Sequence, residues 1–212
     1  MPAEHTPTKS DRTRAAILDA AEDLFAESGF DGASLDAIGK RAGIQGTAIF
    51  YHFPSKRDLY EAVLDRLFQP LLAELNRTLG STESVDTRLA GAVEAIVGFA
   101  AEHPNAPRLL LRETASSSSA AREIIEARVA TSTAGVIEAL AAQSEDPDID
   151  PVVVVNIIVG AVCFYFVGPP GLGGESTYDP RDPQLVEAFV ATMHVLTRSL
   201  LHIGWQTGEY AG

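Results

Sequence analysis

Apolar residues recur at intervals of three and four along most of this chain, which is the spacing of one face of an α-helix. The clearest case follows Ser55, where apolar side chains stand at positions 59, 60, 63, 64, 67, 68, 71, 72 and 75. Almost no segment shows the alternation that is typical of a β-strand. The pattern predicts an all-α protein of about nine helices.

The expected helices begin and end at ordinary helix signals. Ser10 is the expected N-cap of the first helix and Gly29 its end, and Ser34 caps a second helix that Gly43 breaks. Pro70 lies inside the long helix after Ser55 and should bend it. The other expected ranges are 45–53, 84–103, 106–115, 119–143, 151–167 and 183–203, with an irregular loop over 168–181.

The apolar run from Val152 to Val167 is the most hydrophobic segment of the chain. Its valines and isoleucines also suit a buried strand, but its length and the Asp150-Pro151 start favour a helix. It is shorter than the roughly 20 residues that span a bilayer. Because a helix that is apolar all round needs cover on every side, we expect it to pair with the 183–203 helix in a homodimer. The alternative is the central helix of a monomer's core.

The charge of the chain is unevenly distributed. The net charge is −13, yet residues 1–60 contribute only −2 and contain all three lysines. The acidity of residues 61–212 argues against a polyanion that covers the whole surface. It does not exclude a nucleic-acid role for residues 1–60. The N-terminus has no apolar signal core, and Cys163 is the only cysteine. These features predict a cytoplasmic protein without disulfides.

Two short helices joined by a tight turn at Ala42-Gly43-Ile44 fit a helix-turn-helix. Gly43 permits the sharp turn, and a short second helix with small residues at its start suits the major groove of DNA. Packed helix corners that bind no DNA are also common. Spacing alone therefore leaves both interpretations open.

The residues themselves resemble the DNA-binding head of the TetR family of bacterial regulators. Four segments carry the resemblance: SLDAI at 34–38, RAGI at 41–44, FYHF at 50–53 and SKRDL at 55–59. The resemblance implies a head over residues 1–55 and an effector-binding and dimerisation body over 56–212. It also implies a ligand-responsive repressor that binds a palindromic operator in double-stranded DNA as a dimer. The expected alternative is an all-α protein-interaction module without DNA binding.

By the same resemblance, the third helix reads DNA. The implied DNA-binding residues are Ser34, Arg41, Gln45, Gly46, Thr47, Phe50, Tyr51, His52 and Lys56. Phe50 departs from the family, which often has a tyrosine there, and Gln45 stands where a capping serine is common. We expect the cations of the head to form a basic face while Glu22, Asp23 and Glu27 point away from it.

The body offers an apolar lining with a few polar points, which suits a small hydrophobic or amphipathic effector. The candidate effector-binding residues are Phe68, Phe99, His103, Leu110, Asn156, Phe164 and Tyr165, with Arg112 and Glu113 as further polar points. For any single aromatic residue, a place in the core is the simpler interpretation. The sequence shows no nucleophile elbow, phosphate loop or metal-spaced motif, so we expect no enzymatic activity, cofactor or metal.

Overall fold

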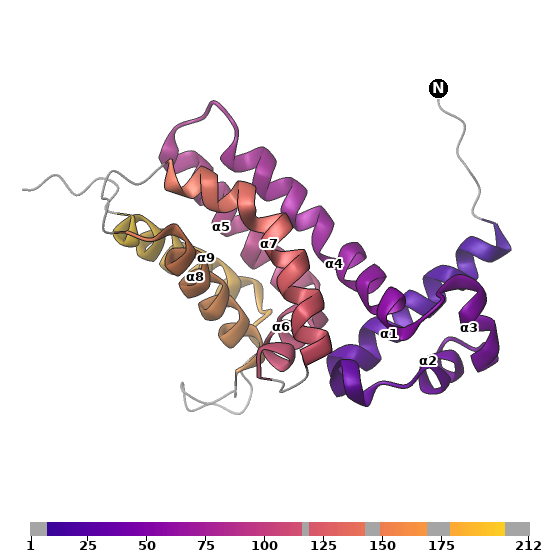
Figure 1. The fold of residues 1–212 in the computed structure, drawn as a ribbon. Helices are drawn as coiled ribbons and strands as arrows, with labels where there is room; N and C mark the ends of the chain where they lie inside the picture. Colours follow the sequence, from indigo (N-terminus) through magenta and orange to yellow (C-terminus); the bar gives the residue numbers. More distant parts are fainter. Residues whose placement is uncertain (1–7, 116–118, 143–148, 169–178, 202–212) are drawn as a thin grey trace, which may run out of the picture. The chain divides into compact units, whose positions relative to one another are not determined.

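The computed structural model describes residues 8–115, 119–142, 149–168 and 179–201. Within these ranges every regular element is an α-helix, as predicted. The order of the helices is shown in Figure 1, and their bounds are α1 Lys9–Gly32, α2 Leu35–Arg41, α3 Gly46–His52, α4 Lys56–Leu79, α5 Val85–Glu102, α6 Asn105–Ala115, α7 Ser119–Ala141, α8 Pro151–Val167 and α9 Pro183–Leu200.

Side chains cap most of these helices where the sequence placed a cap. The Ser34 hydroxyl accepts a hydrogen bond from Ala37 N at 3.1 Å, and the Ser55 hydroxyl accepts one from Asp58 N at 3.1 Å. Asp150 and Asp182 cap α8 and α9, and each is followed by a proline in the first turn of its helix. Residues 152–167 therefore form a helix rather than a strand.

The start of α1 differs from the prediction. Thr8, not Ser10, is the N-cap, because Thr8 and Asp11 form a capping box in which each side chain bonds the other residue's backbone N–H. Gly29 has a φ of +73°, so it interrupts the helical conformation as predicted, although a further short turn extends to Gly32. Helix α4 continues through Pro70. The bend expected at this proline stays a prediction.

The chain divides into two compact units, which are described separately. The first unit comprises Met1–Phe68 and Arg108–Ile125, and the second comprises Gln69–Pro107 and Glu126–Gly212. The core of the first unit joins the three N-terminal helices to the start of α4, with Leu109 and Ile124 added from far along the chain. These two units do not coincide with the predicted head of residues 1–55 and body of residues 56–212. The predicted division concerns function, and it stays a prediction.

The core of the second unit is formed by residues of α4, α5, α7, α8 and α9. Val154, Ile158 and Val162 place one face of α8 in this core, and Met193 does the same for α9. Cys163 of α8 is also buried, and burial raises the pKa of its thiol to about 11. Cys163 therefore behaves as a small, buried apolar residue.

Candidate nucleic-acid interface

Helices α2 and α3 are held by a short turn and a shared core. Gly43 has a φ of +72°, a conformation that glycine adopts without strain, and Ile44 N donates to Gly39 O at 2.9 Å across the turn. Ile38 from α2 and Ile49 from α3 are fully buried. These contacts fix the orientation of α3 against α2, which is what a helix-turn-helix requires.

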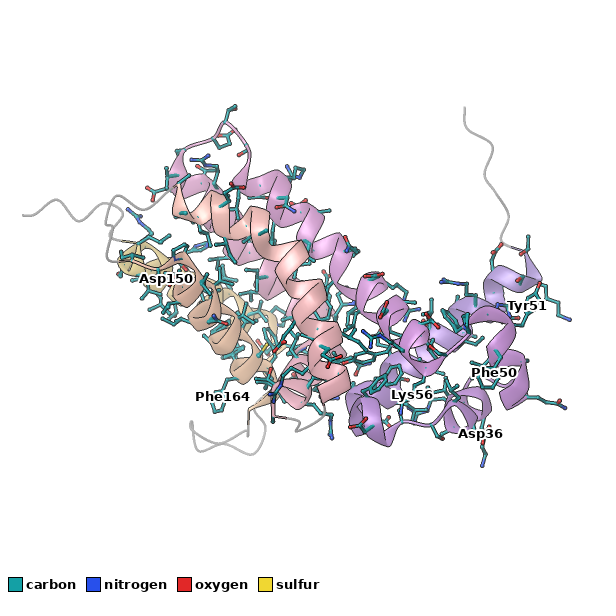
Figure 2. The ribbon with its side chains drawn as sticks, in the orientation of Figure 1. Asp36, Phe50, Tyr51, Lys56, Asp150 and Phe164 are labelled. Carbon is teal, nitrogen blue, oxygen red and sulfur yellow. The ribbon has the colours of Figure 1, made fainter. Side chains whose placement is uncertain are left out.

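The same anchoring turns two aromatic side chains of α3 outward. Ile49 and Phe53 lie one helical turn apart and are both buried, so the neighbouring positions face away from the core. Phe50 is 55% exposed and Tyr51 84% exposed, and both project from α3 in Figure 2. The ring of His52 packs edge-on against Tyr51 at a centroid distance of 5.1 Å. The exposed side of α3 is therefore rich in aromatic surface.

The start of α3 is less completely described. Gln45 is the exposed N-cap, and its side chain makes no capping hydrogen bond. Gly46 and Thr47 begin the helix, and the side chain of Thr47 lies outside the described part of the structure. Ser34 caps α2 as described above, so its hydroxyl has a structural role whether or not it also contacts DNA.

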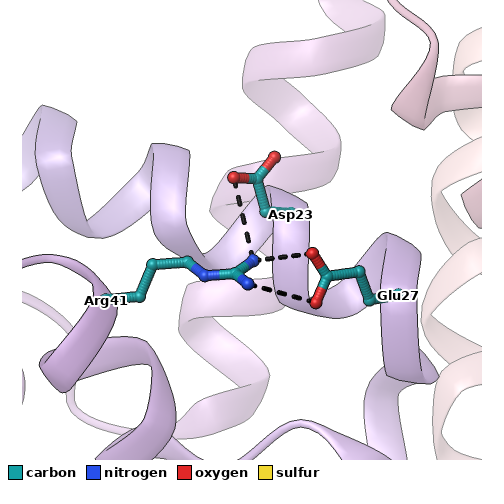
Figure 3. A network of polar contacts seen from close by, with 3 residues as sticks. All are labelled: Asp23, Glu27 and Arg41. Atoms are coloured by element: carbon teal, nitrogen blue, oxygen red, sulfur yellow. Dashed lines mark hydrogen bonds and ion pairs between the residues drawn. The ribbon is translucent and has the colours of Figure 1, made fainter.

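Arg41 is held by two carboxylates of α1 (Figure 3). Its guanidinium donates to both carboxylate oxygens of Glu27, at 2.8 and 3.3 Å, and lies 3.8 Å from Asp23 Oδ2. The pKa of Arg41 is raised, chiefly because its hydrogen bond to the Glu27 carboxylate stabilises the charged guanidinium. The expectation that Asp23 and Glu27 point away from the cations of the head is therefore wrong, because α1 and α2 cross closely enough to pair them.

Two other cations of the first unit, Lys56 and Arg14, lie over aromatic rings. The Lys56 ammonium donates to Asp31 O at 3.2 Å and stands 4.7 Å from the centre of the Phe30 ring. The Arg14 guanidinium stands 4.8 Å from the centre of the Phe53 ring. Such contacts hold a cation close to the surface while leaving part of it open to an anion. They keep positive charge beside α1 and at the start of α4.

Comparisons with known proteins agree with a helix-turn-helix in the N-terminal part of the chain. The family model described as bacterial regulatory proteins of the tetR family matches residues 17–63. The HTH-type transcriptional regulator TtgW of Pseudomonas putida, which is uncharacterized, is 31% identical over 94 residues, which cover 44% of this chain and 70% of that protein. The chain belongs to the TetR family.

Two further relatives extend the comparison. The HTH-type transcriptional activator FasR of Mycolicibacterium smegmatis is 35% identical over 100 residues, 47% of this chain and 46% of FasR, so the match spans about half the length of that relative. The crystal structure of FadR from Bacillus subtilis with stearoyl-CoA shares the fold over 89% of this chain and 99% of that chain, with a TM-score of 0.67 and 18% identity. The TetR family consists of regulators rather than enzymes.

The described residues add two findings that concern other kinds of site. No helix among them is long and apolar enough to cross a membrane. They also contain no group of three or more histidine, cysteine or acidic side chains that could hold a metal ion. His194, whose ring lies 3.1 Å from Ala90 O, takes part in the packing of α9 on α5.

Among the predicted effector residues of this TetR-family chain, three take part in packing within the second unit. The rings of Phe99 and His103 lie 4.7 Å apart at the end of α5. Tyr165 donates its hydroxyl to Leu185 O at 3.1 Å and stacks on Phe189 at 3.8 Å, which joins α8 to α9. These contacts give each side chain a structural role, and an effector role stays a prediction.

The other four predicted effector residues lie in different surroundings. Phe68 and Leu110 belong to the first unit, where Phe68 packs half-buried against the core. Asn156 and Phe164 are exposed on α8, and Asn156 donates to Val152 O of its own helix at 2.9 Å. A cavity of about 400 Å³ in the first unit is lined by none of the seven residues; its lining is Ser28, Gly29, Phe30, Asp31, Arg112, Glu113 and Ala115.

Arg112 and Glu113, expected as polar points of an effector pocket, line this cavity and hold the end of α1, and an effector role stays a prediction. Glu113 is only 3% exposed and accepts a hydrogen bond from Phe30 N at 2.8 Å. Arg112 Nε donates to Ala26 O at 3.2 Å. Burial, and then the nearby Glu113 carboxylate, raise the pKa of Tyr60. Periodicity and spacing do not predict the contact between Phe30 and Glu113, because 83 residues separate them in the chain.

Removing the negative charge of Glu27 beside Arg41 should strengthen DNA binding. In the Glu27→Gln variant we expect roughly three- to tenfold tighter binding to duplex DNA at low salt, because the Arg41 guanidinium loses the charge that neutralises it and attracts a phosphate more strongly. The plot of log affinity against log salt should steepen by about one per subunit. Fluorescence anisotropy with a labelled duplex at several salt concentrations measures both quantities.

Asp19→Asn is the matched control for this variant. Asp19 also lies on α1, but it pairs with Arg66 of α4 at 2.7 Å, so the substitution removes the same charge without changing the partners of Arg41. We expect the control to bind DNA as the unchanged protein does. Equal gains in the two variants would show that only net charge matters and would exclude Arg41 as a phosphate contact.

Proposed function

We propose that this chain is a repressor that binds a palindromic operator as a homodimer and is released by a small hydrophobic or amphipathic effector. The observation that carries the DNA-binding role is the exposed aromatic side of α3, which Ile49 and Phe53 anchor to the core. In a helix-turn-helix this second helix enters the major groove. The proposed DNA-binding residues are the nine predicted from the sequence. Eight of them lie in the proposed head of residues 1–55, and Lys56 directly follows it.

An apolar stripe on α8 supports the homodimer. Val153, Ile157, Gly160 and Phe164 lie on one face of this helix and are all exposed, with Ile157 40% and Phe164 55% exposed. Phe164 is labelled in Figure 2. Gly160 lies near the middle of the stripe, and a Cβ added there would meet nothing within 4 Å. The backbone of α8 is therefore open to close approach at this point. Such a surface suits close packing against the helix of a second copy.

The neighbouring helix α9 continues this apolar character. Leu185 and Val195 are exposed, with Ala188 and Thr192 between them on the same face. The Thr192 hydroxyl donates to Ala188 O at 2.8 Å, so the polar atom is satisfied within its own helix and the methyl group is left for contact. We therefore place the dimer interface on α8 and α9, as a four-helix bundle formed by two copies.

The effector proposal is supported by the FadR structure, which holds stearoyl-CoA. An acyl-CoA has an apolar chain and a charged head, so it belongs to the proposed amphipathic class. A ligand releases a regulator from DNA only if it binds the free form more tightly than the DNA-bound form. Stearoyl-CoA, stearic acid and free coenzyme A are therefore suitable first probes.

DNA binding is tested by selecting duplexes from a random-sequence pool with the full-length dimer, followed by measurements at two salt concentrations with competitor DNA. We expect a palindromic site bound by one dimer, with an affinity that falls as salt rises. The probes should then weaken binding to that site. Failure to select any preferred duplex with folded dimeric protein would overturn the proposal and favour the protein-interaction module.

The direction of regulation needs its own measurement, because the relative FasR is named an activator. A reporter gene under a promoter that contains the selected site should be expressed less when the protein is present. Higher expression would replace the repressor by an activator and leave the DNA-binding proposal intact.

A further inference from the structure

Phe50 is an unusual residue to leave in water. Among the described side chains of the head, the large apolar or aromatic residues with high exposure are Phe50 and Tyr51, and only Tyr51 carries a polar atom. An exposed phenyl ring gains free energy when an apolar partner covers it. The core does not supply that partner, since Ile49 and Phe53 already occupy the buried side of α3.

The position of Phe50 limits what its partner can be. It lies on the helix that faces the major groove in the proposed complex, next to Tyr51 on the exposed side of α3 (Figure 2). A phenyl ring cannot donate a hydrogen bond to a phosphate or to a base edge. The apolar group that the major groove offers on a base is the C5-methyl of thymine, which phenylalanine is suited to contact.

We propose that Phe50 reads a thymine in each half of the operator by packing against its C5-methyl group. This inference rests on the proposed function and adds to it the chemical group that the side chain recognises. Phe50 is thereby a specificity-determining residue, whereas a tyrosine at the same position has a hydroxyl that can bond a phosphate. The phenylalanine that stands where the family often has a tyrosine therefore predicts a thymine at the operator position that it contacts.

Replacing thymine by uracil, which removes only the methyl group, tests this contact. After selection of an operator as described above, each thymine is replaced in turn, symmetrically in both halves, and affinity is measured by anisotropy. At one symmetric pair of positions we expect binding to weaken about 15-fold, since burying one methyl contributes about fourfold and the dimer contacts two. The Phe50→Ala variant should bind the thymine and uracil duplexes equally.

Tyr51→Phe serves as the matched control, because it changes the adjacent exposed ring and leaves Phe50 in place. Because Tyr51 is itself a proposed DNA-binding residue, the quantity compared is the ratio of the affinities for the thymine and uracil duplexes, and this ratio should equal that of the unchanged protein. Should Phe50→Ala bind too weakly to measure, Phe50→Leu keeps an apolar side chain and is expected to retain part of that sensitivity.

The possible failures are distinguishable. If a preferred duplex is selected and no uracil substitution weakens binding, Phe50 contacts no thymine methyl and this inference alone is overturned. The same holds if Phe50→Ala keeps the full sensitivity to uracil. If no preferred duplex is selected, the proposed function and this inference fall together.

Discussion

Replacing Glu113 by alanine should lower the free energy of unfolding of the first unit by about 2–3 kcal/mol. The Glu113 carboxylate is 3% exposed and accepts the Phe30 N–H at 2.8 Å. Hydrogen bonds to a charged group contribute about 1.5–3 kcal/mol, and losing the acceptor leaves that N–H without its partner. The substitution also removes side-chain volume beside the end of α1, which adds a packing loss.

The position of Gly29 shows how closely the two segments approach. A Cβ added at Gly29 would lie 3.2 Å from Arg112 Cδ and 3.5 Å from Glu113 Oε1, and its φ of +73° already disfavours other residues. Because Arg112 and Glu113 lie this close to Gly29, local adjustment has little room to compensate for the loss of Glu113. We therefore expect the end of α1 to open first.

Amide hydrogen exchange at Phe30, together with urea unfolding followed by circular dichroism, measures this effect. Glu113→Gln is the matched control: it keeps an oxygen that accepts from Phe30 N and removes only the charge, so most of the protection should remain. Alanine and glutamine variants that exchange alike would show that the hydrogen bond contributes little. An alanine variant as stable as the unchanged protein would contradict the prediction outright.

Helix ends and helix faces could be predicted because their signals are local. Ser34, Asp150 and Asp182 each bond a backbone N–H within three residues, so the cap can be recognised from the sequence. The wrong N-cap predicted for α1, Ser10 instead of Thr8, also concerns a local signal. Ser10 lies nearer to the first apolar residues, but Thr8 has an acidic partner three residues on and forms the capping box.

Contacts between distant segments could not be predicted in this way. The pairing of Arg41 with Glu27 depends on how α1 and α2 cross, which periodicity does not specify. The same is true of Glu113, whose partner lies 83 residues away, and of Leu109, which enters the core of the first unit. The apolar character of α8 was evident from the sequence, whereas the side left exposed became known only from the structure.

Placing a charge on the exposed stripe of α8 should separate the subunits and abolish tight DNA binding. Ile157→Glu introduces two carboxylates into the proposed dimer interface, where each would lose water without gaining a partner. We expect a monomer at micromolar concentration. Operator affinity should fall at least 100-fold, because a dimer joins two half-site contacts and a monomer makes only one.

Sedimentation velocity and operator binding, measured on the same samples, test this expectation. Val195→Glu, at a position that is 67% exposed on α9, should have the same consequence if α8 and α9 form one interface. Ala73→Glu is the matched control, since it adds the same charge at an exposed position of α4. The control should remain a dimer with unchanged affinity.

Each departure from this pattern has a distinct meaning for how the protein engages DNA. A dimeric Ile157→Glu variant would place the interface elsewhere on the chain. A monomeric variant that keeps full operator affinity would show that one head suffices, which contradicts a palindromic operator. Circular dichroism should show unchanged helix content in all three variants, because each substituted side chain already contacts water in the single chain. Loss of DNA binding can then be assigned to the separation of the subunits rather than to unfolding.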